Sequence, residues 1–208
     1  MSTGRSEDVE TAFVAVGSNL GDRLRLLRSA AADLDRAPGV AVEACSSIWI
    51  TAPVLPAHLA GHSQPHQGEF YNGVLRLRTT RSAPDLLELL LEIERRHGRR
   101  RAESASSGPP RPRTLDLDLL LFGELTTSGP RLTVPHPRLG ERHFVLEPLC
   151  ELVPDLVVPG RGASVRDLLA ALRRRDVDPA PPGASRPGRL KVPPEQWCPP
   201  GPARSPKT

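Results

Sequence analysis

The sequence predicts one α+β or α/β domain with the element order βαββαβ. Between Thr11 and about Arg175, strand and helix signals alternate without an internal repeat. Two extended stretches, residues 40–51 and 70–79, are suited to pair as antiparallel neighbours. The chain has 208 residues, of which 38% are hydrophobic, so its length fits a single core.

Local patterns predict the first three elements. Residues 11–16 are an apolar run that ends at Gly17, which predicts a buried strand followed by a turn. Asn19 or Asp22 can cap the helix that follows, and Pro38 and Gly39 stop it. Its apolar positions have helical spacing: Leu24, Leu27, Ala31 and Leu34. Residues 40–51 then predict a second strand.

The second half continues the same alternation. Residues 70–79 predict a third strand, and Pro84 lies in the first turn of a helix at 85–97 that Gly98 ends. The apolar stripe of this helix is Leu86, Leu89, Leu90 and Ile93. Residues 115–122 predict the fourth strand, and residues 142–152 and 164–173 are further helical candidates.

The composition excludes a membrane-spanning protein and argues against an exported one. No apolar run approaches the roughly 20 residues that a membrane span needs, and the acidic N-terminus lacks a signal-peptide core. The net charge of +4 is weak evidence for nucleic acid, because residues 173–208 alone carry eight basic and three acidic residues. We expect a flexible N-terminus at 1–10, a domain at 11–175, and a disordered Pro/Arg-rich tail at 176–208.

The three cysteines are an odd number at wide spacing. Cys45, Cys150 and Cys198 therefore suggest neither a disulfide framework nor a metal clip, and they predict a reducing compartment. We expect a cytoplasmic monomer that acts on small molecules and has no nucleic-acid or membrane partner.

Two aspartates carry the clearest chemical signal. On a strand, Leu115, Leu117, Leu119 and Leu121 would point to one side, and Asp116 and Asp118 to the other. Two carboxylates roughly 5 to 7 Å apart repel, and a hard cation such as Mg²⁺ offsets this by taking oxygen ligands from both. The alternative is a solvated polar face, which is common on strands.

Arginines near both ends of this strand favour the metal site. Arg99, Arg101 and Arg113 precede the aspartates, and Arg131 and Arg142 follow them. Acidic residues for a metal and arginines for phosphate oxygens are what phosphoryl transfer requires. No GxxxxGK[ST] phosphate loop is present, and the Gly17 to Gly21 turn has the wrong spacing for a dinucleotide fingerprint.

Taken together, the motifs resemble the 6-hydroxymethyl-7,8-dihydropterin pyrophosphokinase family. Six stretches match the family in order over roughly residues 11–172: Gly17 to Gly21; Thr51-Ala52-Pro53; Phe70-Tyr71-Asn72; Glu94 with Gly98, Arg99 and Arg101; Pro112 to Asp118; and Arg131 with Pro135, His136, Arg142 and Phe144.

The resemblance implies a ferredoxin-like βαββαβ core and transfer of the β,γ-pyrophosphoryl group of ATP to the pterin hydroxymethyl oxygen, releasing AMP, in folate biosynthesis. It makes Asp116 and Asp118 ligands of two Mg²⁺ ions, with Asp118 a candidate acceptor of the hydroxyl proton.

The resemblance also implies which residues bind the substrates. Phosphate contacts would come from Arg99, Arg101, Arg113 and Arg142. The nucleotide side would comprise Glu94, Leu119, Arg131, Thr133 and His136. The pterin side would comprise Thr51, Val54, Phe70, Asn72 and Phe144. Singly, each has a structural alternative, such as a core position for Phe70 or Phe144.

Two loops depart from the family pattern. The stretch 53–69 is long and contains His58, His62 and His66, which would share one face of a helix and could bind zinc, although Gly61, Pro65 and Gly68 disfavour that helix. The stretch 102–112 is rich in Gly, Ser and Pro and lacks the tryptophan that many members have there. Position 137 is proline, so a side-chain hydroxyl or backbone N–H contact is absent there.

Two other functions fit parts of the pattern. A catalytically weak nucleotide-binding relative would keep the fold but not the reaction. An RNA-recognition module shares the βαββαβ order, but it needs aromatic residues on its third strand, where residues 73–78 are aliphatic and basic.

Overall fold

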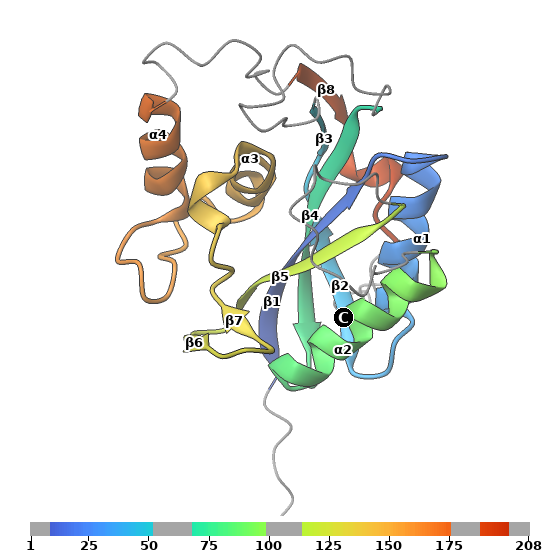
Figure 1. The fold of residues 1–208 in the computed structure, drawn as a ribbon, viewed down its shortest axis with the longest axis horizontal. Coiled ribbons are helices and arrows are strands. Elements are labelled where there is room, and N and C mark those ends of the chain that lie inside the picture. Colours follow the sequence, from blue (N-terminus) through green and yellow to red (C-terminus); the bar gives the residue numbers. More distant parts are fainter. Residues whose placement is uncertain (1–8, 52–67, 99–113, 176–187, 200–208) are drawn as a thin grey trace, which may run out of the picture.

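A six-stranded antiparallel sheet forms the centre of the computed structural model, which describes residues 9–51, 68–98, 114–175 and 188–199 (Figure 1). The strands run in the order β5-β1-β4-β3-β8, and β2 also pairs with β4. Their bounds are β1 Glu10–Ser18, β2 Val40–Cys45, β3 Ile48–Thr51, β4 Phe70–Thr79, β5 Asp116–Phe122 and β8 Gly188–Val192. The predicted pairing of residues 40–51 with 70–79 is confirmed.

Helices cover both faces of this sheet. The helices α1 (Arg23–Asp35) and α2 (Ala83–Arg96) pack on one face, and α3 (His143–Leu152) and α4 (Val165–Arg175) lie on the other (Figure 1). Each face has its own buried cluster of apolar side chains. The α+β class is therefore confirmed. In the described part of the chain, no helix is long and apolar enough to cross a bilayer.

Side-chain caps fix where the first two helices begin. The Asp22 carboxylate accepts the N–H of Arg25 at 3.1 Å, so Asp22, rather than Asn19, caps α1. Ser82 caps α2, and the helix therefore starts at Ala83, two residues earlier than expected. In both helices the buried face follows the predicted stripe.

The predicted strand at 40–51 is broken into β2 and β3. At the break, Ser46 donates its N–H to the oxygen of Val74, and its hydroxyl accepts the N–H of Val74, each at 2.9 Å. The serine side chain thus replaces one backbone partner of the ladder, and the chain bends at Ser46 and Ser47. We call these two residues the serine bend.

The alternation along β5 is interrupted once. Leu115, Leu117 and Leu119 face α1 and α2 as predicted, but Leu121 belongs to the cluster under α3 and α4. The register with β1 shifts between Phe13, which faces Leu121, and Val14, which faces Leu119. One extra residue in β5 reverses the alternation beyond it, so the predicted orientation of Leu121 is wrong. The bulge lies beyond the two aspartates and leaves their shared face unchanged.

The prediction of a disordered tail at 176–208 is wrong for residues 188–199. Gly188–Val192 forms β8 on the outer edge of β3, the 3-10 helix η3 (Pro194–Gln196) follows, and Trp197 is buried in the core. The buried indole, the pairing with β3 and a disulfide, rather than a periodic pattern, offset the entropy cost of ordering this segment. Cys198 forms a disulfide with Cys45, contrary to the expected absence of one. The other tail residues lie outside the described ranges.

Candidate active site

Strand register brings the two halves of the predicted site onto one face of the sheet. Gly17 of β1 lies opposite Asp116 of β5 on one side and opposite Asn72 of β4 on the other. Directly paired residues of antiparallel strands point to the same face. Asp116, Gly17 and Asn72 therefore form a row across three strands, with the acidic residue at one end and the amide at the other. Asp118 lies on the same face, opposite Ala15.

Gly17 leaves the middle of this row without a side chain. A Cβ at this position would lie 3.1 Å from Asn72 Oδ1 and 4.0 Å from Asp116 Cβ. Because β1 runs between the other two strands, any side chain here would stand between the amide and the carboxylate. The missing side chain therefore leaves room for a ligand that contacts both.

Replacing Gly17 with alanine should raise the KM for the pterin about fivefold and leave the KM for ATP nearly unchanged, since a small misplacement of a binding group weakens productive binding. The new methyl group displaces the Asn72 amide by a few tenths of an ångström. Steady-state kinetics with each substrate varied in turn measures both constants. An equal rise in both would indicate general distortion of the sheet and contradict this local role.

Asp116 and Asp118 are partly exposed, so a cation from solvent could reach their oxygens. Asp118 Oδ2 lies 3.7 Å from Arg142 Nη1, which places a cation beside this carboxylate before any ligand binds. Among the residues that the structure describes, no group of three or more His, Cys, Asp or Glu side chains could hold a metal. Two carboxylates do fit Mg²⁺, which commonly takes one or two from the protein and completes its shell with waters and phosphate oxygens.

Glu94 supports the strand between the two aspartates. Its side chain is 1% exposed, and Oε1 accepts the N–H of Leu117 at 2.7 Å. Because β5 is at the edge of the sheet, Glu94 supplies an acceptor where no further strand does. Glu94 was predicted on the nucleotide side. The structure places it behind the strand that carries Asp116 and Asp118, outside the lining of the adjoining cavity.

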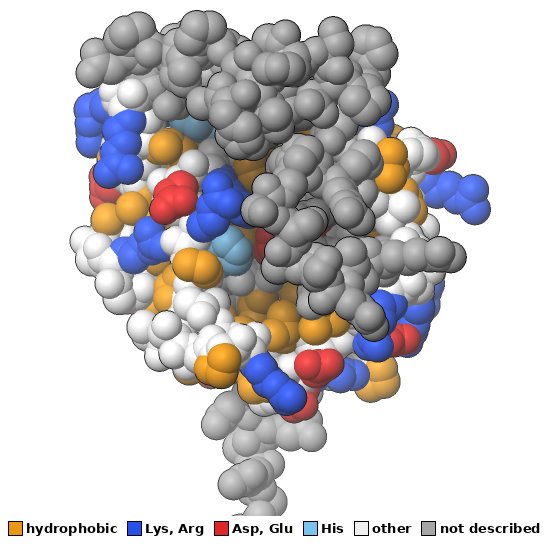
Figure 2. Space-filling model, in the orientation of Figure 1, with side chains coloured by type: hydrophobic (Ala, Val, Ile, Leu, Met, Phe, Trp, Pro, Cys, Tyr) orange, Lys and Arg blue, Asp and Glu red, His pale blue; other side chains and the backbone are white. Residues whose placement is uncertain are grey.

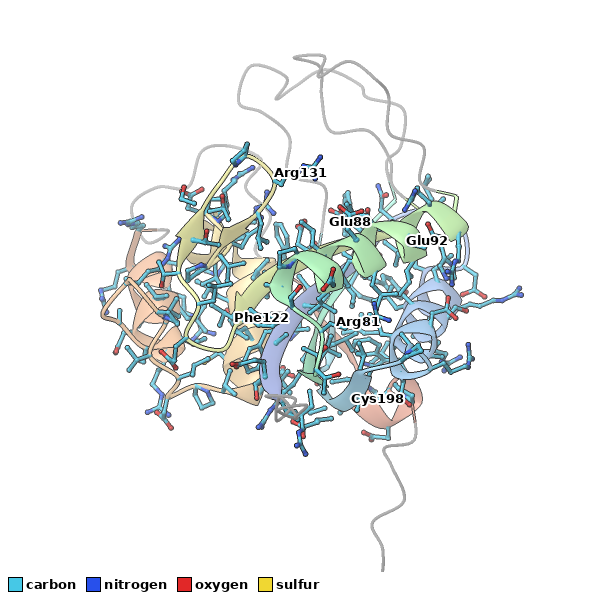
Figure 3. The ribbon with its side chains drawn as sticks, turned by 90° about the horizontal axis from the view of Figure 1, so that it is seen from below. Arg81, Glu88, Glu92, Phe122, Arg131 and Cys198 are labelled. Atoms are coloured by element: carbon cyan, nitrogen blue, oxygen red, sulfur yellow. A yellow bond between two sulfur atoms is a disulfide. The ribbon has the colours of Figure 1, made fainter. Side chains whose placement is uncertain are left out.

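A cavity of about 120 Å³ adjoins Asp118. Four residues that were predicted for the nucleotide line it: Leu119, Arg131, Thr133 and His136. Its remaining walls are Leu117, Leu132, and Leu87 and Leu91 of α2. Thr133 belongs to the short strand β7 (Thr133–Val134), which pairs with β6 (Thr127–Ser128), and Figure 3 shows Arg131 in the connection between them.

Sequence reasoning missed Leu87 and Leu91. They lie one turn apart on α2 and outside the apolar stripe that packs on the sheet. The sequence signal for them was that α2 has these two leucines in addition to the apolar stripe that packs on the sheet. They give the cavity an apolar wall opposite Arg131 and Thr133.

A larger hollow, of about 590 Å³, lies elsewhere on α2 and has no connection with the predicted residues. It follows the outer side of the helix, where Figure 3 shows Arg81, Glu88 and Glu92. Its lining residues are mostly charged and exposed, without apolar walls that could enclose a ring. The smaller cavity, which reaches Asp118, is the chemically relevant one.

The position of His136 is fixed by its backbone and its ring. Its N–H donates to Leu120 O at 2.9 Å, and the N–H of Arg138 donates to its Nδ1 at 3.2 Å. Burial lowers the pKa of His136, and the charge of Asp118 partly offsets this. At neutral pH the ring is therefore uncharged, and with Nδ1 accepting a hydrogen bond, its proton is on Nε2.

Arg161 holds the loop that carries His136 from outside. Its Nη2 donates to Pro137 O at 2.8 Å, from the turn between α3 and α4. On the face drawn in Figure 2, basic side chains and a histidine gather over the connection between β7 and α3 and border the atoms drawn in grey. This part of the surface is suited to anionic ligands.

The amide half of the site is built from β3 and β4. Asn72 Nδ2 donates to Thr51 Oγ1 at 2.9 Å, and both side chains are buried. Phe70 lies opposite Thr51 in the ladder and is half-buried. Phe144 lies in the first turn of α3, and the Arg142 guanidinium carbon lies 5.5 Å from the centre of its ring, which is a cation–π contact. Arg142 thus contacts both Phe144 and Asp118.

Comparison with known proteins identifies the family. The profile of the 7,8-dihydro-6-hydroxymethylpterin-pyrophosphokinase family matches residues 13–154, more than half of the chain. The chain belongs to this family. The matched residues run from within β1 to beyond the end of α3 and include all the described site residues.

Full-length relatives agree with this membership. A Synechocystis 2-amino-4-hydroxy-6-hydroxymethyldihydropteridine pyrophosphokinase is 39% identical over 91% of this chain and 89% of its own. The Pseudomonas aeruginosa protein of that name is 40% identical over 78% of this chain and 92% of its own. A crystal structure of a Plasmodium falciparum HPPK-DHPS protein shares the fold, with a TM-score of 0.59 at 12% identity over 83% of this chain and 47% of that one.

Several predicted residues of this pyrophosphokinase lie outside the described ranges. These are Val54, Arg99, Arg101 and Arg113, together with the three histidines His58, His62 and His66. The structure brings Asp118, Leu119, Arg131, Thr133 and His136 together around the small cavity. Thr51, Phe70 and Asn72 lie together on β3 and β4.

Proposed function

We propose that this chain catalyses the reaction of its family, the transfer of the pyrophosphoryl group of ATP to the hydroxymethyl oxygen of 6-hydroxymethyl-7,8-dihydropterin. The products are the pterin diphosphate and AMP, and the reaction belongs to folate biosynthesis. The observation that carries this proposal is the row Asp116, Gly17 and Asn72, which sets a carboxylate suited to a metal and an amide suited to a ring on one face of the sheet. A catalytically weak relative and an RNA-recognition module are not favoured, because the family match covers the complete described site.

Asp116 and Asp118 would hold two Mg²⁺ ions. When bound, Mg²⁺ would neutralise phosphate charge and hold the reacting oxygens in line. The donor set supports this assignment, since two half-exposed carboxylates on one face leave space for waters and phosphate oxygens.

The adenine ring of the nucleotide would occupy the cavity beside Asp118. Leu87, Leu91 and Leu119 offer an apolar surface for the adenine ring, and Thr133 and neutral His136 offer hydrogen bonds. Arg131 and Arg142 carry the positive charge on this side, and Arg99, Arg101 and Arg113 would complete the phosphate contacts. The charge of these arginines stabilises the phosphate oxygens as the bond to the leaving AMP breaks.

The pterin would lie between Asn72 and Asp118. The Asn72 amide and Thr51 hydroxyl suit the hydrogen-bonding edge of the ring, and Phe70 and Phe144 suit its faces. The hydroxymethyl group would then point toward Asp118, whose carboxylate would accept its proton as the oxygen attacks the β-phosphorus. Arg142 Nη1, 3.7 Å from Asp118 Oδ2, would help to hold this carboxylate in position.

Product identity tests this proposal. Purified protein with ATP, Mg²⁺ and the hydroxymethyl pterin should form AMP and pterin diphosphate in equal amounts, as measured by ion-exchange chromatography. ADP as the nucleotide product would show a different reaction class. Binding of ATP in calorimetry without any AMP would instead support the catalytically weak relative. We further propose a cytoplasmic monomer, which light scattering and cell fractionation would test.

A further inference from the structure

Both tryptophans of this chain fix the serine bend between β2 and β3. Trp197 donates its indole N–H to Ser46 O at 2.9 Å. On the other face, Trp49 donates its indole N–H to Glu151 Oε1 at 3.0 Å, and Ser47 N–H donates to Glu151 Oε2 at 2.8 Å. The bend is thus held from both sides of the sheet, although neither tryptophan contacts the reacting groups in the proposed mechanism.

Trp197 packs directly behind the amide of the pterin half. A Cβ on Gly73 would lie 3.0 and 3.2 Å from two ring carbons of Trp197, so this indole fills the space that a side chain would take. Gly73 follows Asn72 in β4, and successive residues of a strand face opposite sides. The indole therefore supports the backbone of Asn72 from the face opposite to the ligand.

The segment that carries Trp197 is attached at three further points. We call residues 188–199 the C-terminal strap. Val192 pairs with Ile48 of β3, Arg28 of α1 donates to Gln196 O at 2.6 Å, and Cys198 is bonded to Cys45 at the end of β2. Figure 3 shows Cys198 and Arg131 on opposite sides of the molecule, and no strap residue lines the nucleotide cavity.

β3 depends on this attachment because its own pairing is short. Three residues, Trp49 to Thr51, are in register with β4, and the serine bend precedes them. Without the strap, β3 would be an edge strand of four residues, which is marginal by itself. The contact of Thr51 Oγ1 with Asn72 Nδ2 requires β3 to hold its register against β4.

We propose that Trp197 is a positioning residue for the pterin half of the site, and that the Cys45–Cys198 bond, when it is formed, keeps it in place. This inference rests on the proposed function. Trp197 acts through Gly73 and the serine bend on the positions of Asn72 and Thr51. The nucleotide half of the site should not respond to changes at Trp197 or to loss of the disulfide, since its cavity is formed by α2, β5, β7 and the following loop.

Reduction of the disulfide should release the strap. A dithiol reductant such as dithiothreitol supplies two electrons and two protons, so that the bond between the two sulfur atoms breaks and two thiols form, while the reductant closes to its own disulfide. The bond joins residues 153 positions apart, so breaking it removes a long-range constraint on the chain end. Trp197, one residue from Cys198, would then leave its position for part of the time.

The first test compares the oxidised and the dithiothreitol-treated full-length protein. Reduction should raise the pterin KM about tenfold and change the ATP KM less than about twofold, because the loss is one of positioning in the pterin half. Cys198→Ser should show the high pterin KM with or without reductant. Cys150→Ser is the matched control, because Cys150 is a free thiol, and it should respond to reductant as the wild type does.

The second test is a double-substitution cycle between Gly73 and Trp197. Gly73→Ala alone should raise the pterin KM, because its methyl group meets the indole, and it should add little in a Trp197→Ala background. In Trp197→Phe, the phenyl ring fills much of the space of the indole but has no N–H. The pterin KM should therefore lie between those of the wild type and Trp197→Ala. Glu195→Ala, on the exposed part of the strap, should have no effect.

These measurements separate the inference from the proposed function. Absence of AMP formation by the oxidised wild type would refute the proposed function. AMP formation with a pterin KM that is indifferent to reductant and to Cys198→Ser, or with both KM values rising together, would overturn the positioning role. If Trp197→Ala does not fold, the reduced wild type and Cys198→Ser decide the question without it.

Discussion

Replacing Asp118 with asparagine should lower kcat for AMP formation about a thousandfold, the scale expected when a charged group that acts on the reacting phosphates is lost. Asparagine keeps the size of the side chain but removes its negative charge and one oxygen that could bind a metal. It also removes the proton acceptor and leaves Arg142 without this carboxylate, 3.7 Å away. Initial rates at saturating ATP, Mg²⁺ and pterin measure the effect.

Asp116→Asn should be similarly damaging, because the two carboxylates share one face of β5. Asp155→Asn is the control, since Asp155 is exposed and pairs with Arg166 on the surface. Its kcat should match the wild type. An Asp118→Asn protein with more than about a tenth of wild-type activity would be incompatible with a role for this carboxylate in the chemical step.

Glu94→Ala should reduce both the stability and the activity of the enzyme. The buried N–H of Leu117 would lose its acceptor and a cavity would open beside β5, at a cost of about 2–4 kcal/mol in the free energy of unfolding. Because Leu117 lies between Asp116 and Asp118, the displaced strand should also lower kcat. Urea unfolding and steady-state kinetics measure the two effects.

Glu94→Gln distinguishes hydrogen bonding from charge. Glutamine keeps an oxygen that can accept from Leu117 N–H, so it should retain most of the stability that alanine loses. Glu92→Ala on the same helix is the control, because Glu92 forms exposed pairs with Arg95 and Arg96, and it should change stability by less than about 0.5 kcal/mol. Equal losses in Glu94→Gln and Glu94→Ala would mean that the carboxylate charge dominates.

The elements were predictable wherever the pattern was local. The stripe of α2, the apolar run of β1 and the pair Asp116 and Asp118 are each visible within a few residues of sequence. Ser82 and Asp22 are cap residues by type, so the helix starts were within reach. The resemblance to the family depended on all the motifs in order, and no single stretch of sequence carried it.

The bulge in β5 and the break at the serine bend were not predictable in the same way. Each depends on which residue of a neighbouring strand takes the next hydrogen bond, as Val74 does with Ser46. The role of Glu94 was also hidden, because its partner is a backbone N–H on another element. Side-chain identity gives no information on such a partner.

The C-terminal strap is the largest difference between prediction and structure. Ten prolines and the absence of periodicity predicted disorder from residue 176 onward. One buried tryptophan, one disulfide and a short β pairing order residues 188–199 instead. These contacts join positions more than a hundred residues apart, and a window of sequence cannot contain both partners.

The sequence alone indicated an α+β pyrophosphokinase with two aspartates on one strand face, because alternation along a strand is a property of neighbouring residues and the order of the motifs can be read along the chain. The tertiary structure decided that Asn72 and Asp116 share a row with Gly17 between them, and that Trp197 lies behind Asn72. Both follow from register and packing between distant segments, which depend on the whole core rather than on any local stretch.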